Sequence, residues 1–350
     1  MADKMTHSIQ IINPLNYDGW DDLVLSSQGY SFFHSLAWAK TLSESYNYNP
    51  LYFSIIEDNK LIALIPVMEI KSNLTGRRGV SLPFSDFCEP IFSHEKYFQN
   101  LFQYIISYGK DAKWKYLELR TLNNISNDYI GSLQYYHHTI DLSPQEEKIF
   151  YNFKYSARKC INRATRKGVK VVISQTKESL MEFYRLLCIT RKKLGVPPQP
   201  WHFFEKFYEH IIITNSGFLS LALYNDNVIG GLITSHFGDK VIFKYGASDQ
   251  KYYRLNPNNM LIWEALKQYA QNGYKSISLG RTDFENEGLR KYKIAYGANE
   301  TIITNYKYDF KKEQFIQDTY KEVTWINKLL KKAPLSLLKI TGSLLYKHMG

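Results

Sequence analysis

The feature that most restricts the fold of this chain is an internal repeat. In the first half, two apolar, β-branched runs at residues 51–57 and 61–68 are joined by a short polar turn, a pattern that predicts a β-hairpin. In the second half, the runs 218–224 and 228–234 are joined in the same way. A hairpin with the same kind of turn is therefore expected twice.

A helix and a short strand follow each hairpin. Helical apolar spacing leads to a glycine, expected to cap the helix, and then to a strand that ends in arginine. The segments are 101–108, Gly109 and 116–120 in the first half, and 260–270, Gly273 and 276–281 in the second. A unit of hairpin, helix and returning strand that occurs twice predicts two related α/β domains. The alternative is a chance match between two common units.

The boundary between the domains is expected near residue 145. Pro144 and the acidic residues after it are typical of the start of a helix. We therefore expect a first domain at residues 1–145, a second at 146–312 and a C-terminal helical tail at 313–350.

The composition excludes several classes of protein. Hydrophobic residues make up 44% and charged residues 22% of the 350 residues, which is typical of a globular chain. Cys88, Cys160 and Cys188 form no CxxC pair, which argues against a disulfide framework or a zinc ribbon and favours a reducing cytoplasm. The start of the chain is polar and no long apolar stretch follows, so neither a signal peptide nor a spanning helix is expected.

The formal net charge of +11 is concentrated in two segments. Residues 151–170 carry seven basic side chains and no acid, and residues 323–350 carry five lysines and no acid, while the rest is close to neutral. On a helix, Phe153, Ala157 and Ile161 share one face of the first segment, and its arginines project elsewhere. Such a cluster without an acidic partner indicates contact with an anion, although a solvated helix face is the simpler interpretation.

The basic tail allows two interpretations. Its lysines alternate with apolar residues such as Trp325 and Leu329, as in helices that lie on anionic membrane surfaces. The interpretation preferred from sequence is a terminal helix that packs on the protein body and exposes its lysines to water.

Motifs of many enzyme classes are missing from the sequence. It contains no GxxxxGK[ST] phosphate loop, no GxGxxG after a strand, no HExxH and no GxSxG elbow. No cluster has the spacing of metal ligands, so no metal is expected, and the adjacent His137 and His138 are expected at the surface or in a turn. The remaining classes are a transferase that binds its carried group by shape, or a binding module without catalysis.

Several segments together resemble the FemAB-type branch of the GNAT-like transferases. They are residues 33–40 (FHSLAWAK), 76–90 (GRRGVSLPFSDFCEP), 156–169, 245–248 (YGAS), 256–258 (NPN), 280–281 and 289–297 (LRKYKIAYG). The resemblance extends over about residues 30 to 310 and rests on the order and spacing of these segments.

The resemblance implies an α/β (α+β) fold of two tandem GNAT-like domains, each a mixed sheet flanked by helices, followed by a C-terminal basic helix. It also implies transfer of an acyl or aminoacyl group from an activated carrier to an amine. The donor would be a co-substrate, either acyl-CoA, an acyl carrier or aminoacyl-tRNA, with no permanently bound cofactor. The chain lacks the long charged insertion of some tRNA-using members, which weakens tRNA as the donor.

Three residues become candidates for catalysis through the resemblance: Lys293, Asp86 and Tyr245. A cation at Lys293 would stabilise an oxyanion or a leaving phosphate, and Asp86 would orient or deprotonate the amine. Tyr245 matches an acceptor-facing tyrosine. The structural alternatives are a surface lysine, an aspartate in a turn and a half-buried strand residue.

Six further residues are candidates for substrate binding: Lys40, Arg158, Arg163, Arg191, Arg281 and Asn258. Lys40 matches a lysine that contacts acceptor phosphates in relatives, and Arg191 would complete a clamp, because arginine binds phosphate through two donors. Arg281 would line the cleft at a strand end, or else pair with Asp283 or Glu285.

The sequence thus predicts a cytoplasmic, monomeric transferase that moves an activated acyl or aminoacyl group onto an amine of a peptidoglycan or exopolysaccharide precursor. One alternative is an acyl-CoA-dependent N-acyltransferase that acts on small-molecule amines outside peptidoglycan metabolism. Another is a non-catalytic module that binds phosphorylated or lipid-linked glycans. Peripheral contact with the inner membrane face through residues 323–350 is expected only if the tail binds lipid.

Overall fold

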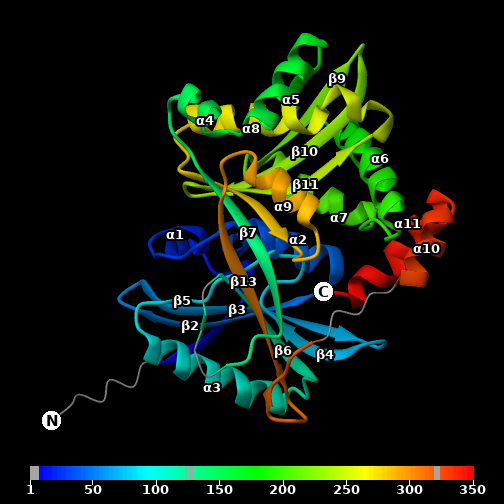
Figure 1. Cartoon of the computed structure of the whole chain (residues 1–350). Helices are drawn as coiled ribbons and strands as arrows, with labels where there is room; N and C mark the ends of the chain where they lie inside the picture. Colours follow the sequence, from blue (N-terminus) through cyan, green and yellow to red (C-terminus); the bar gives the residue numbers. More distant parts are fainter. Residues whose placement is uncertain (1–7, 123, 126–128, 319–323) are drawn as a thin grey trace. The chain divides into compact units, whose positions relative to one another are not determined.

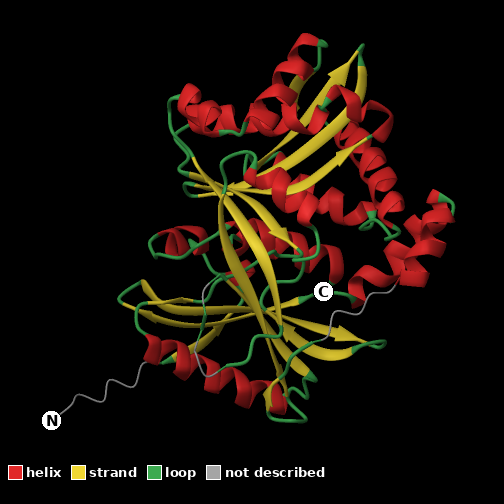
Figure 2. Ribbon diagram, in the orientation of Figure 1, coloured by secondary structure: helices red, strands yellow, loops and turns green. Residues whose placement is uncertain are grey.

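The computed structural model describes residues 8–122, 124–125, 129–318 and 324–350 (Figure 1). By packing, the chain divides into two compact units. Unit 1 comprises Met1–Gln134, Ile302–Tyr320 and Lys347–Gly350, and unit 2 comprises Tyr135–Thr301 and Lys321–Tyr346. Helices and strands occur in both (Figure 2).

Unit 1 is built on a mixed sheet. Its strands, in spatial order, are β1 (Ile9–Ile12), β2 (Asn49–Glu57), β3 (Lys60–Ser72), β4 (Gly76–Val80), β6 (Tyr116–Thr121) and the second part of β13 (Asn299–Asp309). All neighbours are antiparallel except β4 and β6, which pair in parallel. Two short strands, β5 (Ile91–Phe92) and β14 (Gln314–Phe315), pair with β3 and β13.

One long helix provides most of the core on one face of this sheet. In α3 (Glu95–Asp111), Phe98, Leu101, Phe102 and Ile105 recur at helical spacing and are buried against strand residues such as Phe53. The other helical elements of unit 1 are η1 (Pro14–Asn16), α1 (Trp20–Leu25), η2 (Phe32–His34) and α2 (Leu36–Tyr46).

Unit 2 is built on a second mixed sheet. Its strands, in spatial order, are the main part of β7 (Leu133–Asp141), β12 (Ser276–Thr282), β11 (Lys240–Ser248), β10 (Asn227–Phe237), β9 (Gly217–Tyr224) and β8 (Lys170–Ser174). The parallel pair here is β11 with β12, and the other neighbours are antiparallel.

The helices of unit 2 lie before, between and after these strands. They are α4 (Glu146–Asn152), α5 (Tyr155–Arg166), α6 (Lys177–Leu194), α7 (Trp201–Phe207), the π-turn η3 (Tyr208–Ile212), η4 (Gln250–Leu255), α8 (Pro257–Gln271), α9 (Glu287–Ile294), α10 (Thr324–Lys332) and α11 (Leu335–Leu345), followed by η5 (Tyr346–His348). Helices α6 and α8 both pack on strands β9, β10 and β11.

The two sheets have the same plan. In each, three antiparallel strands lead to one parallel pair, and an antiparallel strand follows beyond it. The predicted duplicated fold of two mixed sheets flanked by helices is therefore confirmed. The two β-hairpins are confirmed as well, and their turns use Asp58, Asn59, Asn225 and Asp226 at positive φ.

The strand beyond each parallel pair comes from the other half of the sequence. Strand β7 follows β6 along the chain, yet residues 135–141 belong to unit 2. Strand β13 follows α9, yet residues 302–309 belong to unit 1. Domain limits at residues 145 and 312 stay a prediction, since these units describe packing alone.

Two local expectations were wrong. Gly109 does not cap its helix but lies inside α3, where an added Cβ would approach Phe310 and Trp114 at 2.3 and 2.9 Å; the helix ends at Ala112. The basic segment 151–170 is not one helix, because Phe153 is extended between α4 and α5. Gly273, in contrast, has a φ of +79° just after α8, as a glycine at a helix end does.

The basic tail forms α10 and α11, and both helices contact α6. Leu338 is fully buried, Gly342 approaches Pro198, and the Tyr346 hydroxyl donates to the carbonyl oxygen of Pro197 at 3.1 Å. Residues 319–323 of the predicted tail, which include the first residue of the basic segment 323–350, lie outside the described residues. In the described part of the chain, no helix is long and apolar enough to cross a membrane.

Candidate functional site

The candidate site lies where the parallel strands of unit 2 separate. Strands β11 and β12 pair only over Lys240–Ile242 and Ser276–Ser278. Beyond these residues β11 continues to Ser248 and β12 to Thr282, and β11 stays paired with β10 alone among the described strands. Because parallel strands present their carboxyl ends at one edge of a sheet, this edge is where a ligand is expected.

The corresponding place in unit 1 is occupied by the chain itself. There the parallel pair is limited to Gly79 with Leu117 and Val80 with Glu118. Beyond it, the backbone N–H of Ser81 donates to the carbonyl oxygen of Glu118, and that of Cys88 to the carbonyl oxygen of Arg120. The two sheets thus share a plan but differ at this edge.

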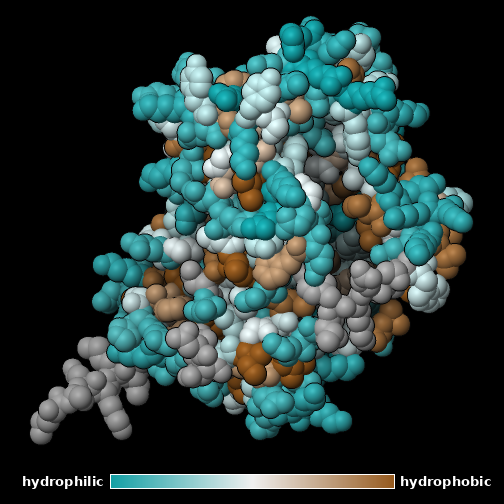
Figure 3. Space-filling model, viewed as in Figure 1, coloured by the Kyte–Doolittle hydropathy of each residue, from teal (hydrophilic) through white to brown (hydrophobic). Residues whose placement is uncertain are grey.

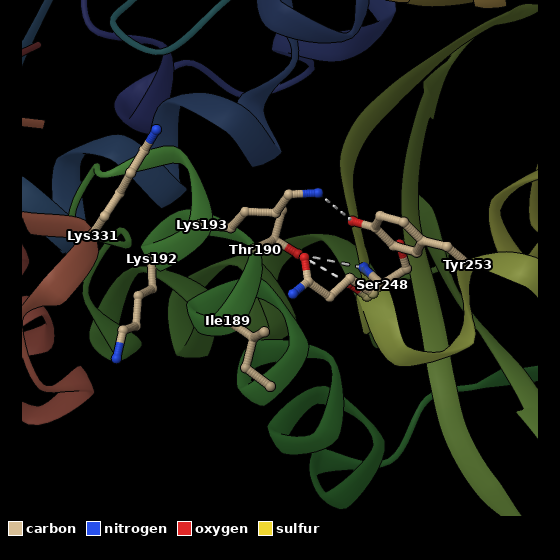
Figure 4. Close-up of a pocket in the computed structure, with 8 residues that line it drawn as sticks. Ile189, Thr190, Lys192, Lys193, Ser248, Tyr253 and Lys331 are labelled. Carbon is tan, nitrogen blue, oxygen red and sulfur yellow. Dashed lines mark hydrogen bonds between the residues drawn. The ribbon is translucent and has the colours of Figure 1, made fainter. Parts of the chain in front are cut away.

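A pocket of about 280 Å³ opens beside the end of β11 (Figure 4). Its lining comes from three places in unit 2: helix α6, the segment after β11, and α10. The lining residues are Ile189, Thr190, Lys192, Lys193, Ser248, Gln250, Tyr253 and Lys331.

The pocket is cationic. Lys192, Lys193 and Lys331 are three of its eight lining residues, and none of the eight is acidic. In Figure 4 the ammonium group of Lys193 points toward Tyr253, and those of Lys192 and Lys331 point away from it. Lys193 lies 4.7 Å from the ring centre of Tyr253 and 3.5 Å from its hydroxyl (Figure 4). Three positive charges around one concavity favour an anionic ligand, and lysine is a common phosphate binder.

The wall between α6 and β11 is fixed by a pair of hydrogen bonds. The Thr190 hydroxyl donates to the carbonyl oxygen of Ser248 at 3.5 Å and accepts from the backbone N–H of Ser248 at 3.4 Å (Figure 4). This contact holds the end of β11 against the helix that carries Lys192 and Lys193.

Lys293 is on α9, its side chain reaches the end of β12, and it is buried, with 7% of its surface exposed. Its ammonium group donates to the carbonyl oxygens of Gly280 and Arg281 at 2.8 and 3.0 Å. The pairing of β12 with β7 shifts register between Ser278 and Arg281, and Gly280 has a φ of +75°. Lys293 therefore fixes a β-bulge at the site edge of β12.

A network of one buried and two partly exposed charged side chains involves strands β7 and β13 and helix α9. The side chain of His138 on β7 is fully buried, and its Nε2 lies 2.9 Å from Oε2 of Glu300. Arg290 on α9 donates to both oxygens of Glu300 at 2.8 and 2.7 Å. These bonds hold the pKa of Glu300 below its ordinary value. Burial lowers the pKa of His138, and the positive charge of Lys293 lowers it further.

The expectation that His137 and His138 lie at the surface was wrong. Both are buried, because protein covers each of the two faces of β7 to which they point. His137 faces the other way from His138, with its Nε2 2.8 Å from the hydroxyl of Ser278. Strand neighbours do point apart, as expected, but each meets protein.

The predicted residues of unit 2 lie in different surroundings. Tyr245 on β11 is buried, with its ring 5.3 to 6.1 Å from those of Phe203, Phe204 and Phe207. Arg281 lies at the end of β12, 4.5 Å above the ring centre of Tyr135. The structure thus brings Lys293 and Arg281 together at the end of β12.

The other predicted binding residues of unit 2 lie on helices. Arg191 is on α6 beside Lys192, but it is not one of the residues that line the pocket. Burial raises the pKa of the Tyr346 hydroxyl, and the positive charge of Arg191 lowers it by a smaller amount. Asn258 is exposed in the first turn of α8. Arg158 is partly exposed and Arg163 exposed on α5, whose buried face is Ala157, Ile161 and Ala164.

Lys40 and Asp86 belong to unit 1. Lys40 is on α2, where its charge lowers the pKa of Asp21, although burial raises that pKa more. Asp86 is partly exposed in the segment that follows β4. Roles for all nine predicted residues stay predictions.

Sequence patterns did not reveal the pocket. Lys192 and Lys193 are ordinary residues of a lysine-rich helix end, and Lys331 is more than a hundred residues away in sequence. The one signal was the tail itself, whose lysines were attributed to a solvated face.

The arrangement defines a GNAT-type acyltransferase fold, and comparison with known proteins agrees. Residues 152–294, from the end of α4 to the end of α9, match the family model described as an acetyltransferase (GNAT) domain. This segment contains the separating strands and all of the pocket except Lys331. Among curated proteins, no sequence matches the chain.

Solved structures show the fold over most of the chain. FemX is 14% identical with a TM-score of 0.65, covering 85% of this chain and 96% of its own. The C-terminal domain of a putative lysylphosphatidylglycerol synthetase from Agrobacterium fabrum is 13% identical with a TM-score of 0.55, covering 83% and 90%. A tandem GNAT protein from the clavulanic acid biosynthesis pathway is 6% identical with a TM-score of 0.52, covering 87% and 99%. The resemblance to FemAB-like transferases of the GNAT superfamily is thus confirmed for the fold.

Proposed function

We propose that this protein transfers an activated acyl or aminoacyl group to an amine of a cell-envelope precursor. The observation that carries the proposal is the separation of β11 and β12 within the GNAT domain, next to a pocket with three lysines. An acyltransferase needs a place for the acyl carbonyl and an anchor for the anionic carrier, and these two features supply both.

The free edge of β11 is suited to hold the acyl carbonyl. After Ile242 the strand no longer pairs with β12, so its backbone groups on that side face the site instead of another described strand. Backbone N–H groups placed beside a carbonyl stabilise the negative oxygen that forms when an amine attacks. In this step the amine nitrogen bonds to the acyl carbon, the carbon–sulfur or carbon–oxygen bond to the carrier breaks, and the amine gives up a proton to a base.

The pocket is suited to the carrier. Acyl-CoA and aminoacyl-tRNA both carry phosphates, which the pantetheine arm separates from the thioester in the first and a single ribose separates from the ester in the second. Lys192, Lys193 and Lys331 supply positive charge for such phosphates at the end of β11. A pocket of about 280 Å³ accommodates part of such a carrier. No permanently bound cofactor is required by this proposal.

Each of the predicted residues has a role in this proposal. Lys293 acts as a positioning residue, because its ammonium group holds the bulge of β12. Tyr245 and Asp86 are the candidates for proton transfer from the amine. Arg281, Arg158, Arg163, Arg191, Asn258 and Lys40 are the candidates for contact with the substrates.

The choice of an envelope acceptor is supported by fold neighbours. FemX aligns with a TM-score of 0.65, and a second neighbour bears the name putative lysylphosphatidylglycerol synthetase, which describes an aminoacyl group on a lipid. We extend this to a peptidoglycan or exopolysaccharide amine, in a monomeric cytoplasmic protein with tRNA as one of its donors.

The deciding experiment incubates the full chain with each donor and each acceptor in turn. The donors are acetyl-CoA, a long-chain acyl-CoA and lysyl-tRNA; the acceptors are a UDP-linked muramyl peptide, a lipid-linked aminosugar and a free polyamine. Mass spectrometry detects the added acyl mass. We expect one donor class to yield product with a muramyl peptide or lipid-linked aminosugar.

A matched variant ties the product to the site. Lys192→Gln with Lys193→Gln removes charge from the pocket, and Lys148→Gln removes one exposed lysine far from β11 in sequence. The first variant should lose product at low donor concentration, and the second should not. Product with the polyamine alone would instead support an acyl-CoA-dependent N-acyltransferase outside envelope metabolism.

A binding module without catalysis is the second candidate, because a cationic pocket binds phosphorylated glycans equally well. Calorimetry with a lipid-linked sugar phosphate separates the two. Tight binding of the glycan with no transfer from any donor would favour the module.

A further inference from the structure

The helices of the tail leave an apolar face uncovered. In α10, Trp325 is 66% and Leu329 60% exposed, and Ile326 is also exposed. In α11, Leu337, Ile340 and Leu344 are 51%, 57% and 61% exposed. Isolated apolar residues at a surface are normal, but six large ones on two adjoining helices are not.

This exposure has a helical order. In α11, Leu338 and Gly342 face the body of unit 2, at a spacing of four residues. Leu337, Ile340 and Leu344 recur at spacings of three and four and fall on the opposite side of the helix. The packing on the protein body expected from the sequence is therefore present, with α6 as the partner. Helix α11 still has a second apolar stripe that no described residue covers.

In α10 the same division holds. Asn327 approaches Gly195 with its carbonyl oxygen, and Lys331 lines the pocket, so this side faces the body. Trp325 and Leu329, one turn apart, lie on the other side. Figure 3 shows hydrophobic and hydrophilic side chains side by side over the region where α10 and α11 lie at the right of Figure 1.

Lysines accompany this apolar face. Lys328, Lys332 and Lys339 are exposed on the same two helices, and residues 324–346 contain no acidic residue. An apolar stripe bordered by lysines is the composition of helices that lie in the interface of an anionic bilayer, with a tryptophan among the apolar anchors. A protein partner would have to present acidic side chains around an apolar centre.

A further pocket of about 350 Å³ borders α11 on unit 2. It is lined by Met181, Tyr184, Arg185, Trp201, Lys339 and Ser343. Lys339 lies 5.5 Å from the ring centre of Tyr184. Two cations beside apolar and aromatic side chains match a phosphate headgroup with the start of an acyl chain.

We infer that α10 and α11 form a membrane-binding surface for anionic phospholipid. This tail surface consists of Trp325, Ile326, Leu329, Leu337, Ile340 and Leu344 together with Lys328, Lys332 and Lys339. The helices lie in the plane of the interface with their apolar stripes among the acyl chains, and the lysines contact lipid phosphates. This inference is independent of the proposed transferase activity.

The test is sedimentation of the full chain with vesicles, without any donor or acceptor. Vesicles of phosphatidylcholine with one quarter phosphatidylglycerol are compared with vesicles of phosphatidylcholine alone. We expect the bound fraction at equal lipid to be at least tenfold higher on the anionic vesicles at low salt and to fall as salt is raised. Equal binding to both vesicle types, or none to either, would overturn the inference.

Two pairs of variants separate the contributions. The first variant removes the apolar stripe of α11 and should abolish sedimentation; it combines Leu337→Gln, Ile340→Gln and Leu344→Gln. Its control replaces three exposed apolar residues elsewhere and should still sediment; it combines Leu74→Gln, Ile130→Gln and Ile173→Gln. Lys328→Gln with Lys332→Gln should weaken binding several-fold, whereas Lys60→Gln with Lys148→Gln, which removes the same charge, should leave it unchanged.

All of these residues are exposed, so each variant should fold, and circular dichroism checks this. Light scattering of the protein without vesicles tests whether a second copy of the chain covers this apolar face instead. If the unmodified chain is a dimer that Leu337→Gln with Ile340→Gln and Leu344→Gln makes monomeric, the surface joins two copies and the membrane inference is wrong. Retention on immobilised RNA that these three substitutions abolish would also contradict it.

Discussion

The ammonium nitrogen of Lys293 lies 2.8 Å from the carbonyl oxygen of Gly280, and this contact holds the end of β12 in a β-bulge. A buried lysine usually carries a large desolvation cost, but here two carbonyl dipoles accept from it. The Lys293 side chain therefore supports the backbone of the candidate site, in addition to any role as a cation near the substrates.

Replacing this lysine should destabilise the protein. Lys293→Met keeps the length of the side chain but leaves the carbonyl oxygens of Gly280 and Arg281 without their donor, which should cost about 1–3 kcal/mol. Urea denaturation measures the loss. Lys291→Met is the matched control, because Lys291 is on the same helix with 79% of its side chain exposed and should change stability by about 0.5 kcal/mol or less. Equal stability of the two variants would show that Lys293 does not support the bulge.

The stability of unit 2 should depend on pH through His138. Its pKa in the folded protein is lowered from 6.5, first by burial and then by the charge of Lys293. The unfolded chain then binds more protons than the folded one below about pH 6.5, so stability is complete above this value and is lost as the pH falls toward the folded pKa. In His138→Gln the loss between neutral pH and pH 5 should be smaller than in the unmodified protein.

The ion pair with Glu300 opposes that lowering. Glu300 accepts from His138 and raises its pKa, so Glu300→Gln should lower the pKa of His138 still further. Imidazole chemical shifts followed by NMR across the titration measure this directly. An upward shift would contradict the assigned contact.

The lysines of the pocket should act on donor binding and not on chemistry. Lys192→Gln with Lys331→Gln removes two charges from the pocket, and should raise KM for a phosphate-bearing donor by about 2- to 30-fold at 0.2–1 kcal/mol for each exposed contact. The kcat should change little, since both lysines are expected to hold the carrier equally in the ground and transition states. Steady-state kinetics at low and high salt checks both statements. A fall in kcat with constant KM would place these lysines at the reacting atoms.

Tyr245 can be tested apart from the fold. Tyr245→Phe keeps the ring among Phe203, Phe204 and Phe207, so stability should fall by only about 1 kcal/mol. If the hydroxyl transfers a proton, kcat should fall by about 10²- to 10⁴-fold. Tyr245→Ala should in addition cost about 3–5 kcal/mol, because it leaves a cavity in a buried aromatic cluster. Full activity of Tyr245→Phe would remove the hydroxyl from the mechanism and leave the ring as core.

Gly109 should tolerate no side chain. Alanine favours a helix by about 1 kcal/mol over glycine, yet its Cβ at this position would lie 2.3 Å from Cζ of Phe310. Gly109→Ala should therefore destabilise the protein by about 1–3 kcal/mol in spite of its higher helix propensity. Gly288→Ala on α9 is the control, since the nearest atom to an added Cβ there is Asn286 Oδ1 at 3.9 Å, and it should be neutral or stabilising. Thermal unfolding followed by circular dichroism compares the two.

Local chemistry made much of the fold predictable. Asp58-Asn59 and Asn225-Asp226 occupy positive φ, which few other residues adopt, and the strands on either side alternate or run apolar as hairpin strands do. The same local signals failed for Gly109, because a glycine needed for close packing looks like a glycine needed for a helix end. The sequence shows only that residue 109 is a glycine. The close approach of Phe310 in the structure shows why no larger side chain fits there.

The candidate site was less accessible to prediction for a related reason. His138 and Glu300 are far apart in sequence, and nothing near either residue shows that they meet. Lys193 and Lys331 come together only because α10 packs on α6. Lys293 is a candidate through family resemblance. Its contacts with Gly280 and Arg281 depend on a β-bulge in β12 that the sequence does not predict.

The placing of β7 and β13 has a consequence for the order in which the protein can fold. When the chain emerges from a ribosome, β6 is made early, but its antiparallel neighbour, residues 302–309, appears only after nearly all of unit 2. Until then β6 presents an unpaired edge, the kind of surface that invites pairing with another nascent chain. A gene truncated after the first half should thus yield an aggregating fragment, and domain shuffling at the middle of this gene should rarely give a stable product.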